Sequence, residues 1–391
     1  MHDLLSRPSA GIFLPSFPRR GYGGPGTIRM TEHIEHLKTL KLRDMILFTV
    51  SAILLADTLT AAASVGASSV SWWIILGVLF FIPFAMICAE MGCAYPEQGG
   101  IYAWIRDGFG GRWASRATWC YWVNTAVWIP AIIYGMLGFE LVSAGSDEMK
   151  DPARDVPRAI FISGVIIITL YILGTMAVLA AIPSGDINLV EGLVDTLTLF
   201  FGESLAGQAL VTILGLGALF SFFSNGVTWA LGCNRAAAEA AMEGELPKIF
   251  AVEDKQRGTP VGSAVLMGLV STLCLVLYGF MSGSNEELFW SLFAFSAVIF
   301  LLPYQGMMLA FLKMRRVDAA HPRPYKVPGG TGTARLAASL CISILAISIF
   351  LFVYTPGSGF EWAVVGGVIV TLIIGEVVIR LAENHCNPAE N

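Results

Sequence analysis

Long apolar stretches separated by short polar segments dominate the chain from about residue 45 onward. A helix of about 20 apolar residues crosses a hydrocarbon core roughly 30 Å thick, so each such stretch is a candidate membrane crossing. Nine stretches qualify: 45–66, 72–89, 117–144, 159–182, 206–232, 260–282, 288–312, 336–356 and 362–379. The pattern predicts an all-α integral membrane protein with about nine transmembrane helices.

Composition supports this interpretation and excludes several others. Of the 391 residues, 55% are hydrophobic and only 14% are charged, as expected for a multi-pass protein whose partner is the lipid bilayer. The loops show no nucleophile–base pair, no phosphate-binding loop and no metal-ligand spacing. We therefore predict that the protein is not an enzyme, needs no cofactor and binds no nucleic acid.

The polar segments outside the crossings predict the domain limits. Residues 1–41 begin with a stretch rich in Pro, Gly and Arg, without the continuous apolar core of a signal peptide. We expect this part to be a disordered cytoplasmic tail, with either Met1 or Met30 as the natural start. The transporter domain is expected over 42–382 and a C-terminal tail over 383–391. The acidic stretch 183–205 predicts an external loop that carries short amphipathic helices.

The basic residues predict orientation. Lys and Arg cluster before the first crossing, at 106–116, 150–158, 235–257 and 313–335, and at Arg380, whereas the intervening loops have none. Because cytoplasmic loops carry the excess of Lys and Arg, both termini are expected in the cytoplasm, with the protein in the cell membrane.

One stretch breaks this alternation. Residues 117–144 have Arg112 and Arg116 before them and Lys150 and Arg154 after them, so both flanks are predicted to be cytoplasmic. A helix of this length is about 42 Å long, too short for two crossings. Either the stretch is a re-entrant hairpin, or the chain lacks crossings that its relatives possess; we favour the second.

Four loop motifs show a family resemblance. "AEMGCAYPEQGGIYAWIRDGFGGRWA" (89–114), "GFELVSAGSDEMKDPARDVPRAI" (138–160), "NRAAAEAAMEGELPKIF" with "GTPVGS" (234–263) and "RPYKVPGG" (323–330) resemble cytoplasmic loops of amino-acid permeases. These belong to the amino acid–polyamine–organocation superfamily. The resemblance covers roughly residues 42–382, and the first loop is somewhat similar to that of the glutamate/4-aminobutyrate exchangers.

This resemblance implies an inverted-repeat (LeuT-like) transporter fold of 12 crossings, of which this chain has an incomplete set. Residues 117–131 resemble the third crossing, and residues from about 132 onward resemble the second half of the sixth. The fourth, the fifth and the first half of the sixth crossing would then be missing. The junction, near 131–134, falls in the stretch where the charge alternation fails.

The resemblance also implies binding residues in the first crossing, because such transporters break this helix near mid-membrane. Here Ala56, Asp57, Thr58 and Thr60 occupy that region instead of the family's glycine-rich break. A carboxylate within a membrane helix is costly unless it is paired, neutralised or solvated. Asp57 is therefore predicted to be a counter-ion for a substrate amine or a proton carrier; the alternative is a hydrogen-bonded Asp that stabilises helix packing.

A second predicted group resembles the break in the family's sixth helix. Gly135 and Gly138 would permit unwinding, Phe139 would close over the substrate, and Glu140 would be the proton-coupling or gating carboxylate. The alternative is that the two glycines only allow close helix packing while Glu140 lies at the membrane interface.

Other residues are weaker candidates. Tyr121, Trp122, Asn124, Asn225 and Trp229 either face the transport cavity or serve in packing. Glu97 and Arg106, with Asp155 and Arg158, either form ion pairs of a cytoplasmic gate or are solvated loop residues.

The function that follows is secondary active transport of amino acids, coupled to a proton or to a counter-substrate, and impaired by the internal deletion. The alternative is a non-transporting truncated membrane protein, or an interaction partner derived from a permease.

Overall fold

The computed structural model describes residues 40–54, 56–97, 99–128, 141, 149, 151–187, 192–202, 204–254, 258–281, 285–355, 357 and 359–386. These residues are almost entirely helical, and the only paired strands described, β1 (Tyr354–Thr355) and β2 (Gly359–Phe360), form a two-residue hairpin. The all-α prediction is therefore confirmed. The predicted N-terminal tail and the end of the C-terminal tail lie outside the described residues, and so does the junction at 131–134.

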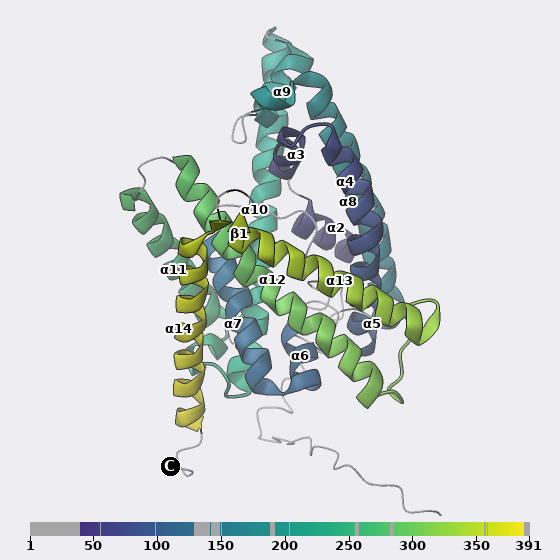
Figure 1. The fold of residues 1–391 in the computed structure, drawn as a ribbon, viewed down its shortest axis with the longest axis vertical. Helices are drawn as coiled ribbons and strands as arrows, with labels where there is room; N and C mark the ends of the chain where they lie inside the picture. Colours follow the sequence, from purple (N-terminus) through teal and green to yellow (C-terminus); the bar gives the residue numbers. More distant parts are fainter. Residues whose placement is uncertain are drawn as a thin grey trace, which may run out of the picture. The chain divides into compact units, whose positions relative to one another are not determined.

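Figure 1 shows the order of the described helices. Before the junction they are α2 (Leu42–Ile53), α3 (Ala56–Ser64), α4 (Ser68–Leu76), a π-helical turn (Gly77–Phe81), α5 (Ile82–Ala94), α6 (Ile101–Phe109) and α7 (Gly111–Trp128). After it they are α8 (Pro152–Ala181), α9 (Gly192–Phe201), α10 (Leu205–Met242), α11 (Val261–Met281), α12 (Asn285–Val317), α13 (Gly330–Val353) and α14 (Trp362–Cys386), with 3₁₀ turns at Ser184–Asp186 and Lys248–Ala251.

Six described helical segments are long and apolar enough to cross a membrane: Ser68–Ala94, Pro152–Ala181, Leu205–Met242, Ala294–Val317, Gly330–Val353 and Trp362–Asn384. The pair α2 and α3 qualifies as a seventh span if the two helices are counted together across their bend of 44°. Residues 117–144 are described only to Trp128 and at Leu141. A multi-pass helical protein is thus supported, whereas the count of nine crossings stays a prediction.

The predicted loop at 183–205 contains short helices, as expected. The 3₁₀ turn at Ser184–Asp186 and the ten-residue α9 occupy it. Its position outside the membrane remains a prediction from the charge pattern.

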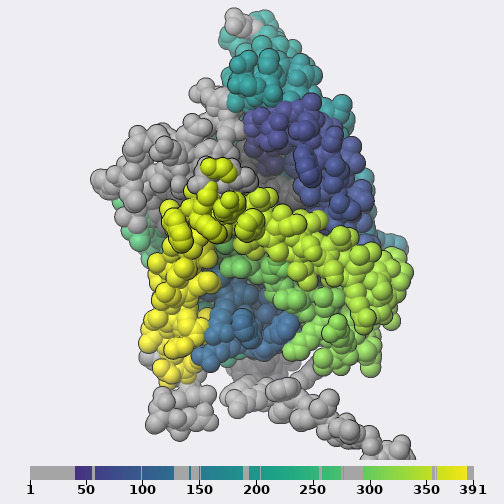
Figure 2. Space-filling model, in the orientation of Figure 1, coloured from purple at the N-terminus to yellow at the C-terminus, as the bar shows by residue number. Residues whose placement is uncertain are grey.

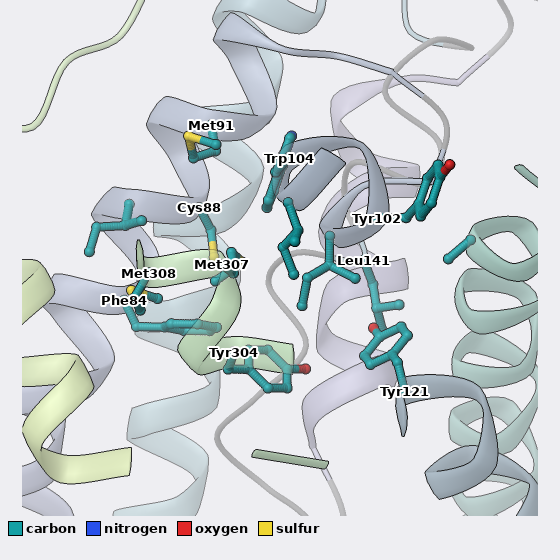
Figure 3. Close-up of a cluster of buried hydrophobic side chains, with 14 of the residues drawn as sticks. Phe84, Cys88, Met91, Tyr102, Trp104, Tyr121, Leu141, Tyr304, Met307 and Met308 are labelled. Atoms are coloured by element: carbon teal, nitrogen blue, oxygen red, sulfur yellow. The ribbon is translucent and has the colours of Figure 1, made fainter. Parts of the chain in front are cut away.

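The core lies where α5, α6, α7 and α12 meet. Figure 3 shows Phe84 and Cys88 of α5 next to Tyr304 and Met308 of α12, and all four side chains are buried. On the face shown in Figure 2, α13 (yellow-green) and α14 (yellow) cover part of this core, and α7 is visible between them. Both helices expose many large apolar side chains, including Leu336, Ile347, Ile369 and Ile373, as expected for helices that face lipid.

α10 is unusual because it is apolar and yet largely uncovered. Only 6% of its most apolar 18-residue window is buried, against 61% for Ser68–Ala94 and 67% for Ala294–Val317. Large apolar side chains are exposed along it, including Ile213, Leu216, Phe220, Phe223 and Val227. Within the described residues, α10 is therefore packed mainly through its C-terminal half, from Asn225 to Ala241.

Candidate functional site

The first predicted crossing is broken between α2 and α3. Leu54 follows α2 in an extended conformation, with φ −78° and ψ 112°, and its N–H still bonds the carbonyl oxygen of Val50 at 2.8 Å. Helix α2 ends there, so the carbonyl groups of its last turn, those of Ser51, Ala52 and Ile53, are accessible to partners outside the helix. The φ of Leu54 is negative, so no glycine is required at this position.

Side chains from two other helices bind these carbonyl groups. Asn225 Nδ2 donates to the carbonyl oxygens of Ser51 at 2.9 Å and Ala52 at 2.7 Å. Trp229 Nε1 donates to the same oxygen of Ala52 at 2.8 Å. From α8, the hydroxyl of Tyr171 donates to the carbonyl oxygen of Ile53 at 2.6 Å. Asn225 and Trp229, predicted only as weak candidates, thus lie directly at the helix break.

Hydroxyl groups continue this polar contact between α2 and α10. Ser51 Oγ lies 2.7 Å from Ser224 Oγ and 3.4 Å from Thr228 Oγ1. A polar contact of this extent is unusual inside an apolar helix, because each unsatisfied polar group in hydrocarbon costs several kcal/mol. The sequence alone did not predict it, since the residues are 173 or more positions apart.

The predicted binding residues are only partly described. Thr58 and Thr60 lie in α3 just after the break, and Thr60 is buried. The backbone of Ala56 and Asp57 forms the first turn of α3, but their side chains lie outside the described part. Gly135, Gly138, Phe139 and Glu140 also fall outside it. Their predicted roles therefore stay predictions.

The candidates on α7 are packed. The ring of Tyr121 contacts Trp229 edge-on, with centroids 6.0 Å apart, and lies parallel to Phe300 at 6.4 Å. Asn124 Oδ1 accepts a hydrogen bond from Ser296 at 2.9 Å, and Trp122 Nε1 donates to Asn234 Oδ1 at 3.0 Å. These contacts agree with the packing alternative, and Tyr121 links that packing to Trp229 at the break.

At the end predicted to be cytoplasmic, Arg106 of α6 is the centre of a charged cluster. Its guanidinium pairs with Glu97, with Asp107 at 3.0 Å and with Glu243 at 2.6 Å. The predicted pair between Glu97 and Arg106 is confirmed, and its further partner Glu243 comes from the turn after α10. Asp155 and Arg158 form no ion pair with another described residue, so the predicted extension of the gate to them is not observed there.

Glu245 holds the same turn against α6 and α7. Its Oε2 accepts hydrogen bonds from the hydroxyls of Tyr102 at 3.0 Å and Ser115 at 2.7 Å. A Cβ at Gly111 would lie only 1.1 Å from Glu245 Oε1, so any larger residue there would displace this carboxylate from its present position. Desolvation by burial raises the pKa of Glu245, although the hydrogen bonds from Ser115 and Tyr102 oppose this shift.

A second charged cluster connects α5 to the segment after α12. Glu90 is 1% exposed and receives a hydrogen bond of 2.7 Å from the backbone N–H of Val327. Arg315 and Arg323 place their Nε atoms 2.9 Å and 3.4 Å from Glu90 Oε1. The motif at 89–114 therefore contacts both the motif at 234–263, through Arg106 and Glu243, and the motif at 323–330, through Glu90 and Arg323.

The comparisons with known proteins agree with this architecture. The family model described as amino acid permease matches residues 40–136 and 124–377. The chain is 26% identical over 438 residues to a protein of Lactococcus lactis subsp. lactis named "Probable agmatine/putrescine antiporter AguD", covering 86% of this chain and 93% of that protein. The aligned stretch is longer than the 391 residues of this chain, so the relative has segments that this chain lacks.

Two further relatives carry transport names. A glutamate/gamma-aminobutyrate antiporter of Lactococcus lactis subsp. lactis is 26% identical over 239 residues, which cover 60% of this chain and 47% of that protein. The polyamine transporter PUT1 of Oryza sativa subsp. japonica is 22% identical over 398 residues, which cover 73% of this chain and 71% of that protein. The family model spans most of the described chain, and its members are transporters rather than enzymes. The chain therefore belongs to the amino acid permease family of membrane transporters, within the amino acid–polyamine–organocation superfamily.

Proposed function

We propose that the protein descends from an exchanger or proton-coupled transporter of small amino compounds, either amino acids or the amines derived from them. The relatives support this substrate class, because their names include agmatine, putrescine, glutamate and gamma-aminobutyrate. The proposed fold is the inverted repeat of this family, in an incomplete form.

The helix break after Ile53 is the observation that carries the proposal. Half-helix ends concentrate partial charge where a substrate with both carboxylate and amine groups can bind. Asp57 is the second residue of α3, so its carboxylate belongs to the segment directly after the break. We propose that Asp57 is the counter-ion for the substrate amine, or the proton carrier. Thr58 and Thr60 would contribute on the same side, and Gly135, Gly138, Phe139 and Glu140 on the opposing segment.

We further propose that the chain has lost the fourth crossing, the fifth and the first half of the sixth. Three observations support this proposal. The family model matches in two stretches that overlap at residues 124–136, the alignment with the agmatine/putrescine relative exceeds the chain in length, and α10 exposes an apolar face along most of its span. In the full family fold, the lost helices would belong to the first repeat, against which the other repeat moves during transport.

Binding and uptake need separate tests, because a chain can bind substrate and still fail to move it. Purified protein should bind radiolabelled putrescine, agmatine, glutamate or gamma-aminobutyrate, and Asp57→Asn should abolish this binding without changing the amount of protein in the membrane. Uptake into proteoliposomes loaded with counter-substrate should be weak or undetectable. A chain that binds none of these compounds would support the alternative, a non-transporting remnant of a permease.

A further inference from the structure

We propose that Asn225 is a positioning residue that holds the carbonyl end of α2 and keeps metal cations out of the helix break. The biological role of this residue rests on the proposed transport function. Its geometry and its test are independent of uptake.

Hydrogen-bond donors surround the freed carbonyl oxygens. The oxygen of Ala52 accepts from both Asn225 and Trp229, at 2.7 and 2.8 Å, which uses both of its lone pairs. The oxygens of Ser51 and Ile53 accept from Asn225 and Tyr171, respectively. Freed carbonyls at such breaks can otherwise coordinate a metal cation. Here the Asn225 amide lies against the oxygens of Ser51 and Ala52, so a cation bound to both would have to displace it.

The orientation of the Asn225 amide follows from its neighbours. Both groups that it contacts are acceptors, so only its NH₂ group can face them, and one amide supplies both hydrogen bonds. Asn225 is 3% exposed, so water does not readily replace it. Asn225 therefore joins two consecutive carbonyl groups of α2 to α10 through one rigid side chain.

An Asp in this position would reverse the chemistry. A carboxylate cannot donate to the two carbonyl oxygens, and placing it against them is repulsive unless it binds a proton or a cation. Together with those carbonyls and the neighbouring hydroxyls of Ser51 and Ser224, it would form an all-oxygen site of the kind that hard cations prefer. The native Asn prevents this, because its NH₂ group donates where a cation would have to bind.

Asn234 provides a matched control on the same helix. It is 4% exposed, and its amide faces Trp122 and Met267 rather than the carbonyls of α2. Asn234→Asp therefore introduces the same chemical change at a similarly buried position, without altering the helix break.

The test is thermal unfolding of the purified full chain in matched concentrations of sodium chloride and choline chloride. We expect equal midpoints for the native protein in the two salts. Asn225→Asp should unfold at a lower temperature in choline and recover by about 2 °C or more in sodium, whereas Asn234→Asp should show no sodium-specific recovery. If Asn225→Asp does not fold, Asn225→Ser serves instead, because it removes both amide donors and should give the same response in weaker form.

Three results would overturn the inference. One is a native protein that sodium stabilises more than choline does. Another is an Asn225 variant that shows no sodium-specific rise, and the third is an equal rise in the Asn234 control. Because unfolding is measured without substrate, failure of the transport proposal leaves this test unaffected.

Discussion

Arg315 and Glu90 form an ion pair inside the protein, with Nε of the guanidinium 2.9 Å from Oε1 of the carboxylate. Glu90 is 1% exposed and Arg323 approaches the same oxygen at 3.4 Å. One carboxylate of α5 thus offsets two guanidinium groups, one from the end of α12 and one from the segment after it. The cluster fixes where the chain turns back toward α13.

Glu90→Gln should therefore be strongly destabilising. Removing one partner of a buried ion pair leaves an uncompensated charge, which costs about 3–5 kcal/mol, and here two guanidiniums would remain. We expect a large fall in the unfolding midpoint of the purified protein. Arg43→Gln is the control. The Arg43 side chain is 82% exposed in its pair with Asp44, and such a surface pair contributes roughly 1 kcal/mol or less. Equal effects of the two substitutions would contradict the structural role of Glu90.

Arg106 and Glu243 should be energetically coupled. Arg106→Gln leaves Glu97, Asp107 and Glu243 close together without their shared cation, so their mutual repulsion adds to the lost attraction. A double-mutant cycle with Glu243→Gln should give a coupling of roughly 1 kcal/mol that decreases as salt is added. An additive double mutant would show that the cluster does not hold the turn after α10 against α6.

Glu245 should give the protein a measurable pH dependence. Burial raises its pKa above the ordinary glutamate value of 4.5, so the folded state binds a proton more readily than the unfolded state does. Stability therefore falls as pH rises from about 4.5 through the folded pKa. The groups that face this carboxylate are Tyr102, Ser115, Glu243 and Arg106.

The comparison variant for this effect is Glu245→Gln, which keeps an oxygen acceptor for Tyr102 and Ser115. Its stability relative to the native protein should be greatest near neutral pH, and the difference should shrink as pH falls toward about 5. Unfolding midpoints of both proteins across this range measure the effect. A difference that is constant with pH would show that Glu245 is not titrating there.

The sequence predicted the helices well because the length of each uninterrupted apolar stretch indicates whether it forms a membrane helix. Apolar stretches such as 159–182 and 336–356 must form helices in a bilayer, where every backbone group needs a partner within its own segment. The break in the first helix was also expected, although through a family resemblance rather than through a local feature. Its actual position, at Leu54, has no glycine to indicate it.

The contacts that hold this break could not be predicted, because they join residues far apart in the chain. In the sequence, Asn225 is one polar residue and Trp229 one aromatic residue of a membrane helix, and packing is the ordinary explanation for such residues. Only the fold places both of them, with Tyr171, against three consecutive carbonyl groups. Glu90 was missed for the same reason, since its partners Arg315 and Arg323 lie in another loop motif.

Orientation can be tested by labelling introduced cysteines with a membrane-impermeant reagent in intact cells. Ser184→Cys should react from outside, because residues 183–205 are predicted to be external. Ala319→Cys, at an exposed position in the basic segment 313–335, should react only after the membrane is opened. The five native cysteines whose side chains the structure describes are buried, and the unmodified chain provides the background for all seven. Labelling of Ala319→Cys in intact cells would show that the predicted orientation of the second half is wrong.

The junction near 131–134 gives the strongest prediction about transport. Alternating access requires one helical bundle to rock against another around a site in mid-membrane. Under the proposed loss of the fourth and fifth crossings, one repeat would be incomplete, which agrees with the uncovered apolar face of α10. The basic residues on both sides of 117–144 also conflict with a single crossing, because one pair of Arg or Lys residues would then lie outside the cell.

Inserting about 80 residues from a full-length relative near residue 131, the length of roughly two and a half crossings with their loops, should therefore restore counter-substrate exchange in proteoliposomes. A scrambled apolar insert of the same length is the control, and strong exchange by the native 391-residue chain would contradict the proposed loss.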